Sequence, residues 1–189
     1  MSEHEGWAST APAVVPSPAA EFFARLVREI GLRHALIGGQ AVNAWSNFRI
    51  TDDYDFCVVP EREPIEAMEA ALLRAGLGYL RRQDTGESSG PDFVRMGNVE
   101  MTRVVDLQTA KTDYQMGVIE RAIPTPSGIC VATPEDLIVL KLLAMRSQDQ
   151  RDIAMLMNWN DLDWPYIEHW AGIWQVTDKL AVFRDGRFD

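Results

Sequence analysis

The sequence predicts an α/β (α+β) fold in which a mixed β-sheet is flanked by helices and followed by a helical C-terminal section. Up to residue 131, short apolar stretches bounded by glycine and proline alternate with segments of helical periodicity. From Thr133 onward the pattern is helical throughout. Of the 189 residues, 47% are hydrophobic and 24% are charged, which is typical of a globular protein and leaves enough apolar residues for a real core.

The first helix is expected to begin at Ser17-Pro18, because serine caps a helix well and proline suits its first position. Apolar residues recur at helical spacing up to Ile30, and Gly31 ends the helix. A buried strand over 35–37 then leads into Gly38-Gly39 and a helical segment over 40–45. A long strand is predicted over 49–59, where Pro60 ends it.

The next elements follow from the same signals, and only residues 112–120 fit neither a helix nor a strand clearly. The pattern predicts a helix over 64–75, a strand over 77–81, a polar loop over 84–91, a hairpin of 93–96 with 99–107 that turns at 97–98, a short hairpin of 123 with 129–131, and helices over 135–147, 149–158 and 166–180.

These elements suggest three parts along the chain. Residues 1–18, rich in Ala, Pro, Ser and Thr, are predicted to be a flexible tail, because they have too little apolar surface to order themselves. Residues 19–131 form the α/β core, and residues 132–189 form a helical section packed on that core.

Composition excludes several classes of protein. A net charge of −10 argues against a broad nucleic-acid-binding surface, which depends on Lys and Arg. No apolar run approaches the roughly 18 residues of a membrane span, and the acidic start of the chain is unlike a signal peptide. Cys57 and Cys130 lie in apolar runs and are expected to be buried free thiols, which fits a cytoplasmic location.

Asp53 and Asp55 are the first candidates for chemistry. Side chains two apart on a strand project from the same face, whereas Asp52 points to the opposite face. Two such close carboxylates repel each other unless a cation lies between them, and a magnesium ion is usually held by one or two carboxylates together with substrate phosphates. The alternative is a strand edge with ordinary surface acids. The buried run that follows, from Phe56 to Val59, favours a site.

Two further features support a site. Gly38-Gly39 stands between a strand and a helix, where glycines let a phosphate approach the backbone N–H groups at the helix start. The pair also marks many plain turns, and it matches neither the P-loop nor the dinucleotide-binding motif. Asp106 interrupts the apolar stretch Val104-Val105-Asp106-Leu107 and is either a strand-end residue or part of the site.

Together, these motifs resemble the nucleotidyltransferase superfamily associated with DNA polymerase beta, in which a Gly-Gly or Gly-Ser turn, an Asp-x-Asp strand and a third strand-borne acid follow in order. The resemblance covers about residues 20 to 158 and is closer to the bacterial branch of abortive-infection toxin-like nucleotidyltransferases. That branch reads roughly G-G-x-A and then R-x-T-x-D-I/L-D. The matching segments here are Gly38-Gly39-Gln40-Ala41, Arg49-Ile50-Thr51-Asp52-Asp53-Tyr54-Asp55 and, on the later helix, Thr133-Pro134-Glu135-Asp136-Leu137-Ile138 with Lys141, Arg146, Asp149 and Asp152.

The chain departs from that branch in two places. Ser46-Asn47 stands where the branch often has His-Gly, and Gln148-Asp149 stands where Lys-Asp is common. Neither departure touches the three acids, but both bear on how nucleotide or acceptor would bind.

The resemblance implies a nucleotidyltransferase fold and the transfer of a nucleoside monophosphate from an NTP such as ATP to an acceptor hydroxyl. Asp53, Asp55 and Asp106 would be the catalytic and metal-binding residues, holding Mg²⁺ or Mn²⁺, and Asp106 would help deprotonate the hydroxyl. The implied nucleotide-binding residues are Gly38, Gly39, Arg49, Thr51 and Lys141. For Lys141 the alternative is a lysine at a helix edge, for Arg49 a salt bridge that braces the strand, and for Arg146, Asp149 and Asp152 a structural ion-pair cluster is favoured.

Two other functions remain open from the sequence. One is a non-catalytic nucleotide- or protein-binding module on the same fold, such as a partner in a toxin–antitoxin pair. The other is a small-molecule, aminoglycoside-like nucleotidyltransferase. The acceptor is therefore a protein, an RNA or a small molecule, and the sequence is compatible with a protein partner or a homodimer.

Overall fold

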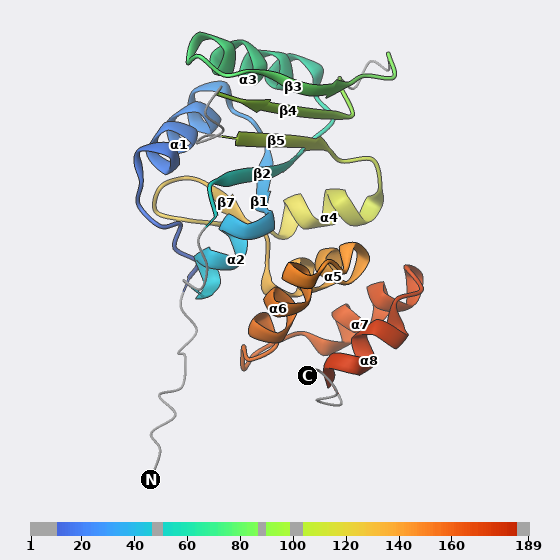
Figure 1. Cartoon of the computed structure of the whole chain (residues 1–189). Coiled ribbons are helices and arrows are strands. Elements are labelled where there is room, and N and C mark those ends of the chain that lie inside the picture. The colour runs from blue at the N-terminus through green and yellow to red at the C-terminus, as the bar shows by residue number, and fades with distance from the viewer. Residues whose placement is uncertain (1–10, 47–50, 87–89, 99–103, 185–189) are drawn as a thin grey trace. The chain divides into compact units, whose positions relative to one another are not determined.

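The structure is a computed structural model that describes residues 11–46, 51–86, 90–98 and 104–184. Its helices are α1 (Pro18–Ile30), α2 (Gly38–Ser46), α3 (Arg62–Arg74), α4 (Asp113–Arg121), α5 (Pro134–Ala144), α6 (Ser147–Leu156), α7 (Trp164–Ile173) and α8 (Thr177–Arg184). Its strands are β1 (His34–Ile37), β2 (Asp53–Val58), β3 (Gly78–Gln83), β4 (Phe93–Gly97), β5 (Val104–Thr109), β6 (Ile123–Pro124) and β7 (Cys130–Val131) (Figure 1). The predicted mixed α/β fold is confirmed.

The chain divides into two compact units. One holds residues 12–133, with the whole sheet, and the other holds helices α5 to α8. The predicted tail, 1–18, lies largely outside the described residues, and the packing of a section 132–189 on the core stays a prediction. No helix in the described part of the chain combines the length and apolar character that crossing a membrane requires.

The sheet is mixed and runs in the order β3-β4-β5-β2-β1-β7-β6 across the described strands. Strand β2 pairs in parallel with β5 and antiparallel with β1, while β1 pairs in parallel with β7. Strands β3, β4 and β5 form an antiparallel meander, so the predicted pairing of 93–96 with the strand through 104–107 is confirmed, while residues 99–103 of the predicted hairpin lie outside the described residues. The central position of β2 places its residues between β1, which precedes Gly38, and β5, which carries Asp106.

One face of the sheet packs against α1 and α3 and forms the core of this unit. Phe23 of α1 lies against the rings of Tyr54 and Phe56, at 4.6 and 5.8 Å between ring centroids. Arg82 of β3 binds Glu69 of α3 at 2.8 Å. Because alternate residues of a strand face opposite sides, this packing leaves Asp53, Asp55 and Cys57 of β2 on the other face.

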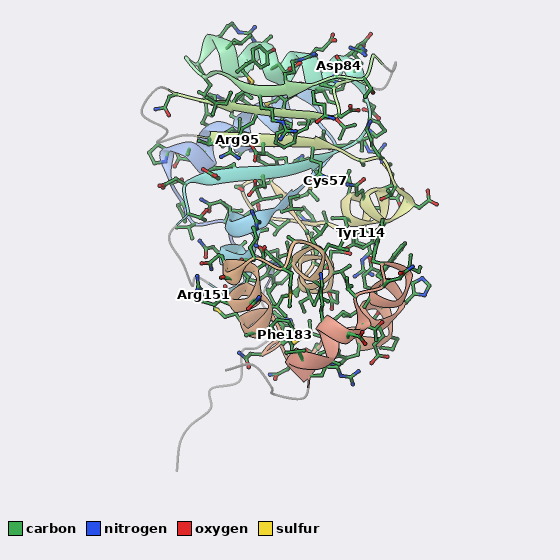
Figure 2. The ribbon with its side chains drawn as sticks, turned by 45° about the vertical axis from the view of Figure 1, so that its right-hand side comes forward. Cys57, Asp84, Arg95, Tyr114, Arg151 and Phe183 are labelled. Atoms are coloured by element: carbon green, nitrogen blue, oxygen red, sulfur yellow. The ribbon has the colours of Figure 1, made fainter. Side chains whose placement is uncertain are left out.

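Helix α4 decides the segment 112–120 that the sequence left open. Thr112 caps it by accepting a hydrogen bond from the Gln115 N–H at 3.2 Å, and Gln115 Oε1 accepts one from the Thr112 N–H in return. The Cys57 thiol lies 4.0 Å from the Gln115 carbonyl oxygen, so α4 covers part of the sheet face opposite α1; Cys57 and Tyr114 of α4 are labelled in Figure 2. Cys57 is buried as predicted, whereas Cys130 is half-buried.

The long strand predicted over 49–59 is shorter in the structure. Residues 47–50 lie outside the described residues, and the strand begins at Asp53. The carbonyl oxygen of Thr51 accepts a hydrogen bond from Gln40 Nε2 of α2 at 2.7 Å. The chain just before the strand is therefore held by a helix side chain.

The single helix predicted over 166–180 is wrong, because the chain forms α7 and α8 there. Gln175 has φ of 55°, and the Val176 N–H donates to the Ala171 carbonyl at 2.8 Å. Gly172 lies inside the last turn of α7, and the left-handed position is taken by Gln175 instead, so the usual glycine signal for a helix end is displaced. Between α5 and α6, Met145 adopts φ of 52°, close to the break that the sequence predicted there.

Candidate metal and nucleotide site

The parallel pairing of β2 with β5 brings the predicted acids together. Asp55 is the register partner of Asp106, and Asp53 lies two residues before Asp55 on the same face. Asp53 is partly exposed, at 43% of its side-chain surface, while Asp106 keeps only 14%. Asp52 is exposed outside the strand. The three acids named from the sequence therefore lie on one face of two neighbouring central strands.

Gly38 is packed directly against Asp55. Strand β1 pairs with β2 so that Ile37 faces Asp55, and Gly38 follows with φ of +67°. A Cβ atom on Gly38 would lie 1.9 Å from Asp55 Oδ2, a distance that no real side chain tolerates. Glycine is thus required for both its backbone conformation and its lack of a side chain. The arrangement places the start of α2 beside the carboxylate of Asp55.

Of three other predicted nucleotide-binding residues, the structure describes Gly39 and Thr51. Gly39 is buried in the first turn of α2, and Thr51 is half-buried with its carbonyl bound to Gln40. Arg49 lies outside the described residues. Their nucleotide contacts stay predictions.

Lys141 belongs to the helical unit, where it forms the centre of a buried ion-pair cluster. Its ammonium group donates to Asp149 Oδ1 at 2.9 Å and to Asp152 Oδ2 at 2.6 Å, and the lysine side chain is 7% exposed. Arg146 binds Asp149 from the other side at 2.7 Å. Burial alone would raise the pKa of Asp149, but the hydrogen bonds from Arg146 and Lys141 outweigh it and hold that pKa at about 2. The triphosphate contact proposed for Lys141 stays a prediction.

Arg95 of β4 completes the acid site, although the sequence did not single it out. Its guanidinium donates to Asp106 Oδ2 at 2.7 Å and to Asp53 Oδ2 at 3.1 Å, so one cation bridges two of the three acids. Arg95 is labelled in Figure 2 at its place on the sheet. The antiparallel register pairs Arg95 with Asp106 and, on its other side, with Arg81. Alternation in Phe93-Val94-Arg95-Met96 assigns Arg95 to the face opposite the buried Val94 and Met96, and only the register reveals its partner.

Burial and the neighbouring charged groups shift the pKa of Asp106. Burial raises its pKa to about 6, Arg95 works against this shift, and the carboxylates of Asp55 and Asp53 add to it. Its Oδ2 binds Arg95, while Oδ1 is buried and has no hydrogen-bond partner within the described residues. A buried acceptor without a donor is costly, and a cation or a hydrogen-bond donor of a ligand can satisfy it.

The carboxylate groups of Asp53, Asp55 and Asp106 are chemically suitable ligands for a divalent cation. Mg²⁺ and Mn²⁺ prefer carboxylate oxygens, and Asp55 and Asp106 present them side by side. As the described side chains stand, however, no three His, Cys, Asp or Glu residues form a group that could hold a metal ion. In this arrangement Arg95 binds Asp53 and Asp106 together.

A hollow of about 540 Å³ opens on the same sheet face, one step along the strands from Asp106 and Arg95. Gln108 lies two residues after Asp106, Phe93 lies two residues before Arg95, and Arg81 stands over the Phe93 ring at 5.6 Å. The lining is otherwise polar and consists of Gln83, Thr85, Asp92, Thr109, Lys111 and Gln115.

Comparisons with known proteins bear on the fold and the family of this chain. No curated protein sequence matches the chain. Among solved structures, the antibiotic-resistance factor ANT(2'')-Ia in solution superimposes with a TM-score of 0.59 at 12% identity, over 90% of this chain and 97% of that one. ANT(2'')-Ia in complex with adenylyl-2''-tobramycin gives 0.51 at 14% identity, over 86% and 93%. The Megavirus polyadenylate synthase gives 0.52 at 13% identity, over 77% of this chain and 32% of that one. At these identities the likeness shows a common fold.

The family comparison is more direct. The model of the family described as "Nucleotidyltransferase of unknown function (DUF6036)" matches residues 31–179, which include Gly38, Asp53, Asp55, Arg95 and Asp106. Both the fold and this match confirm the resemblance to the nucleotidyltransferase superfamily, and the chain belongs to this nucleotidyltransferase family.

Proposed function

We propose that this protein is a divalent-metal-dependent enzyme that transfers a nucleoside monophosphate from an NTP to a hydroxyl group of an acceptor. The bond between the α and β phosphates breaks, and pyrophosphate leaves. The observation that carries the proposal is the register of β2 with β5, which sets Asp55 beside Asp106 while Gly38 touches Asp55. A metal-binding carboxylate pair and a glycine at a helix start are thereby within one small region of the sheet. An NTP needs both, for its metal and for its phosphates.

The residues have distinct roles in this reaction. Asp53, Asp55 and Asp106 hold the metal, and the backbone N–H groups of Gly38 and Gly39 donate to the triphosphate. When bound, the metal supplies charge neutralisation at the phosphates and at the attacking oxygen. Asp55, against Gly38, is next to the phosphates, whereas Asp106 lies one strand further from them.

Asp106 is the residue that we assign to the acceptor hydroxyl. Its buried Oδ1 has no hydrogen-bond partner among the described residues, so it is available to accept a hydrogen bond from a hydroxyl. The hollow at Gln108 and Phe93 begins next to Asp106 on the side away from Gly38. We assign the acceptor to this hollow, because the attacking and leaving oxygens of an in-line displacement lie on opposite sides of the phosphorus. Its amide and hydroxyl side chains suit a polar acceptor.

Transfer of label from α-³²P-NTP tests the proposal. The four NTPs are incubated with Mg²⁺ and with total RNA, with a protein extract or with aminoglycosides such as tobramycin. The wild type is expected to label one of these pools. Loss of even an outer partner of a metal ligand costs about 10–100-fold, so Asp55→Asn is expected to reduce labelling by about a hundredfold or more.

Asp52→Asn is the matched control, because Asp52 is an exposed neighbour outside the strand. It is expected to label as the wild type does. Labelling that survives in Asp55→Asn would contradict the assignment of the site. No labelling of any pool, together with tight binding of a protein partner, would favour the non-catalytic module, and labelling of aminoglycosides alone would identify the small-molecule enzyme.

A further inference from the structure

Arg95 supplies to Asp53 and Asp106 the positive charge that a bound metal ion would supply. Asp53 and Asp106 lie on different strands, and one guanidinium joins them at 3.1 and 2.7 Å. With Asp55 the site holds three carboxylates, and Arg95 neutralises one negative charge. A guanidinium bound by two carboxylates forms strong charge-assisted hydrogen bonds. A metal that binds the same two acids must therefore either displace Arg95 from an oxygen or lie beside its positive charge, and both weaken metal binding.

Deprotonation of Arg95 cannot relieve this competition, because arginine stays protonated in proteins. The guanidinium leaves most readily when another anion replaces the carboxylates. A triphosphate is such an anion, since the planar fork of arginine matches phosphate oxygens as well as carboxylates.

The surroundings of Arg95 allow such a move. Its side chain is 33% exposed, so the guanidinium is not enclosed by the core. Its register partner on the outer side is Arg81, whose guanidinium lies over the Phe93 ring and donates to Gln83 at 3.3 Å. That neighbour is a like charge, which repels Arg95 and offers it no alternative anion. The acids therefore hold Arg95 only until a stronger anion arrives.

We propose that Arg95 is a positioning residue that couples metal binding to nucleotide binding. Without nucleotide, it binds Asp53 and Asp106 and weakens their affinity for a divalent cation. When an NTP binds, the guanidinium moves to its phosphates and releases both carboxylates to the metal. This inference rests on the proposed function for its nucleotide half, while its metal half concerns the protein without substrate.

Titration with Mn²⁺, followed by the electron paramagnetic resonance signal of the free ion, tests the metal half. Arg95→Gln removes the competing charge and is expected to bind Mn²⁺ about tenfold or more tightly than the wild type in the absence of nucleotide, within the usual 5–150-fold range of coupling between sites. Arg81→Gln is the matched control. It removes a cation from the same face that binds none of the three acids among the described residues, and its Mn²⁺ affinity is expected to stay within about twofold of the wild type.

A second titration tests the nucleotide half, with an ATP analogue whose α and β phosphates are joined by a methylene group. The analogue is expected to tighten Mn²⁺ binding to the wild type much more than to Arg95→Gln, after correction for Mn²⁺ bound by the free analogue. Arg95→Lys keeps the charge but forms no two-pronged bridge, and its Mn²⁺ affinity without nucleotide is expected between those of the wild type and Arg95→Gln. This variant also provides the test if Arg95→Gln does not fold, which thermal unfolding would reveal.

An Mn²⁺ affinity of Arg95→Gln, or of Arg95→Lys in its place, that equals or falls below that of the wild type would overturn the proposal. Equal tightening by the analogue in wild type and variant would overturn the coupling. The proposed function fails differently, by the absence of label transfer from the wild type. An Arg95→Gln variant that binds Mn²⁺ more tightly supports the metal half of the inference even then.

Discussion

At the scale of single residues, the site depends on contacts that leave no room for substitution. Gly38 and Asp55 approach until a hypothetical Cβ falls 1.9 Å from a carboxylate oxygen. Asp106 keeps a buried oxygen without a partner in the described structure, and Arg95 holds the opposite oxygen. A buried oxygen without a hydrogen-bond partner costs stability, and such costs are usual at sites that bind a charged ligand.

Comparison of Gly38→Ala with Gly31→Ala separates the cost of a steric clash from the cost of a left-handed backbone conformation. Gly31, at the end of α1, has φ of 70°, nearly equal to that of Gly38, but a Cβ there meets nothing within 4 Å. Gly31→Ala is expected to lower the free energy of unfolding by about 1–2 kcal/mol, the usual cost of a left-handed conformation. Gly38→Ala is expected to cost about 1–3 kcal/mol more, because Asp55 must move to avoid the new methyl group.

Denaturant unfolding of both variants measures the difference. Gly38→Ala is also expected to weaken Mn²⁺ binding, whereas Gly31→Ala leaves it unchanged. Equal losses of stability in the two variants would show that Asp55 does not pack against Gly38 as described.

At the scale of elements, the register of paired strands assembles the acid site. Strand β5 pairs with β2 on one side and with β4 on the other, so Asp106 stands between Asp55 and Arg95. A shift of β4 by one residue would turn Arg95 to the face that α1 and α3 cover. In the helical unit, α5 and α6 are joined in a similar way by Lys141 with Asp149 and Asp152.

Lys141→Met tests the role of that cluster. The change keeps most of the side-chain volume but leaves two buried carboxylates without their shared cation. Breaking a buried ion pair in this way typically costs about 3–5 kcal/mol, so the variant is expected to lose that much stability at neutral pH. Arg146→Met is the control, because the Arg146 side chain is 77% exposed and its loss leaves Asp149 bound to Lys141, so this variant is expected to lose less stability than Lys141→Met.

Urea unfolding at pH 7 compares the two variants with the wild type. A Lys141→Met variant as stable as the wild type, yet with weakened NTP binding, would contradict the structural role and favour the triphosphate contact.

At the scale of the whole molecule, ligand binding is expected to appear as thermal stability. A ligand at 100 times its Kd stabilises the folded state by about 2.7 kcal/mol, and about 1 kcal/mol raises the Tm of a protein of this size by about 2–4 °C. Mg²⁺ together with the preferred NTP is therefore expected to raise the wild-type Tm by roughly 5–10 °C. Mg²⁺ alone is expected to raise it less, because Arg95 competes for the acids.

Differential scanning fluorimetry with each of the four NTPs measures this shift and identifies the preferred nucleotide. Asp55→Asn is expected to lose most of the shift, while Asp52→Asn keeps it. A wild type that no NTP stabilises in the presence of Mg²⁺ would contradict nucleotide binding.

The sequence by itself determined the fold class and most of the elements, and it predicted three acids that the structure brings together on one sheet face. Gly38-Gly39, the Asp53-x-Asp55 spacing and Asp106 are local patterns, and local patterns survive without knowledge of the fold. The sequence pattern predicted one helix over 166–180 where the structure has two, because the turn at Gln175 uses a left-handed conformation without glycine. It left 112–120 open, since the cap of Thr112 and Gln115 is a weak signal beside an unclear periodicity.

Only the tertiary structure decided that Arg95 bridges Asp53 and Asp106 and that Gly38 touches Asp55. Both facts depend on strand order and register, which bring together residues 42 and 17 positions apart in the sequence. The periodicity of a strand assigns a side chain to a face but never to a neighbour on another strand. For that physical reason, the sequence could predict the acids of this site, and the fold alone could show the cation that holds them.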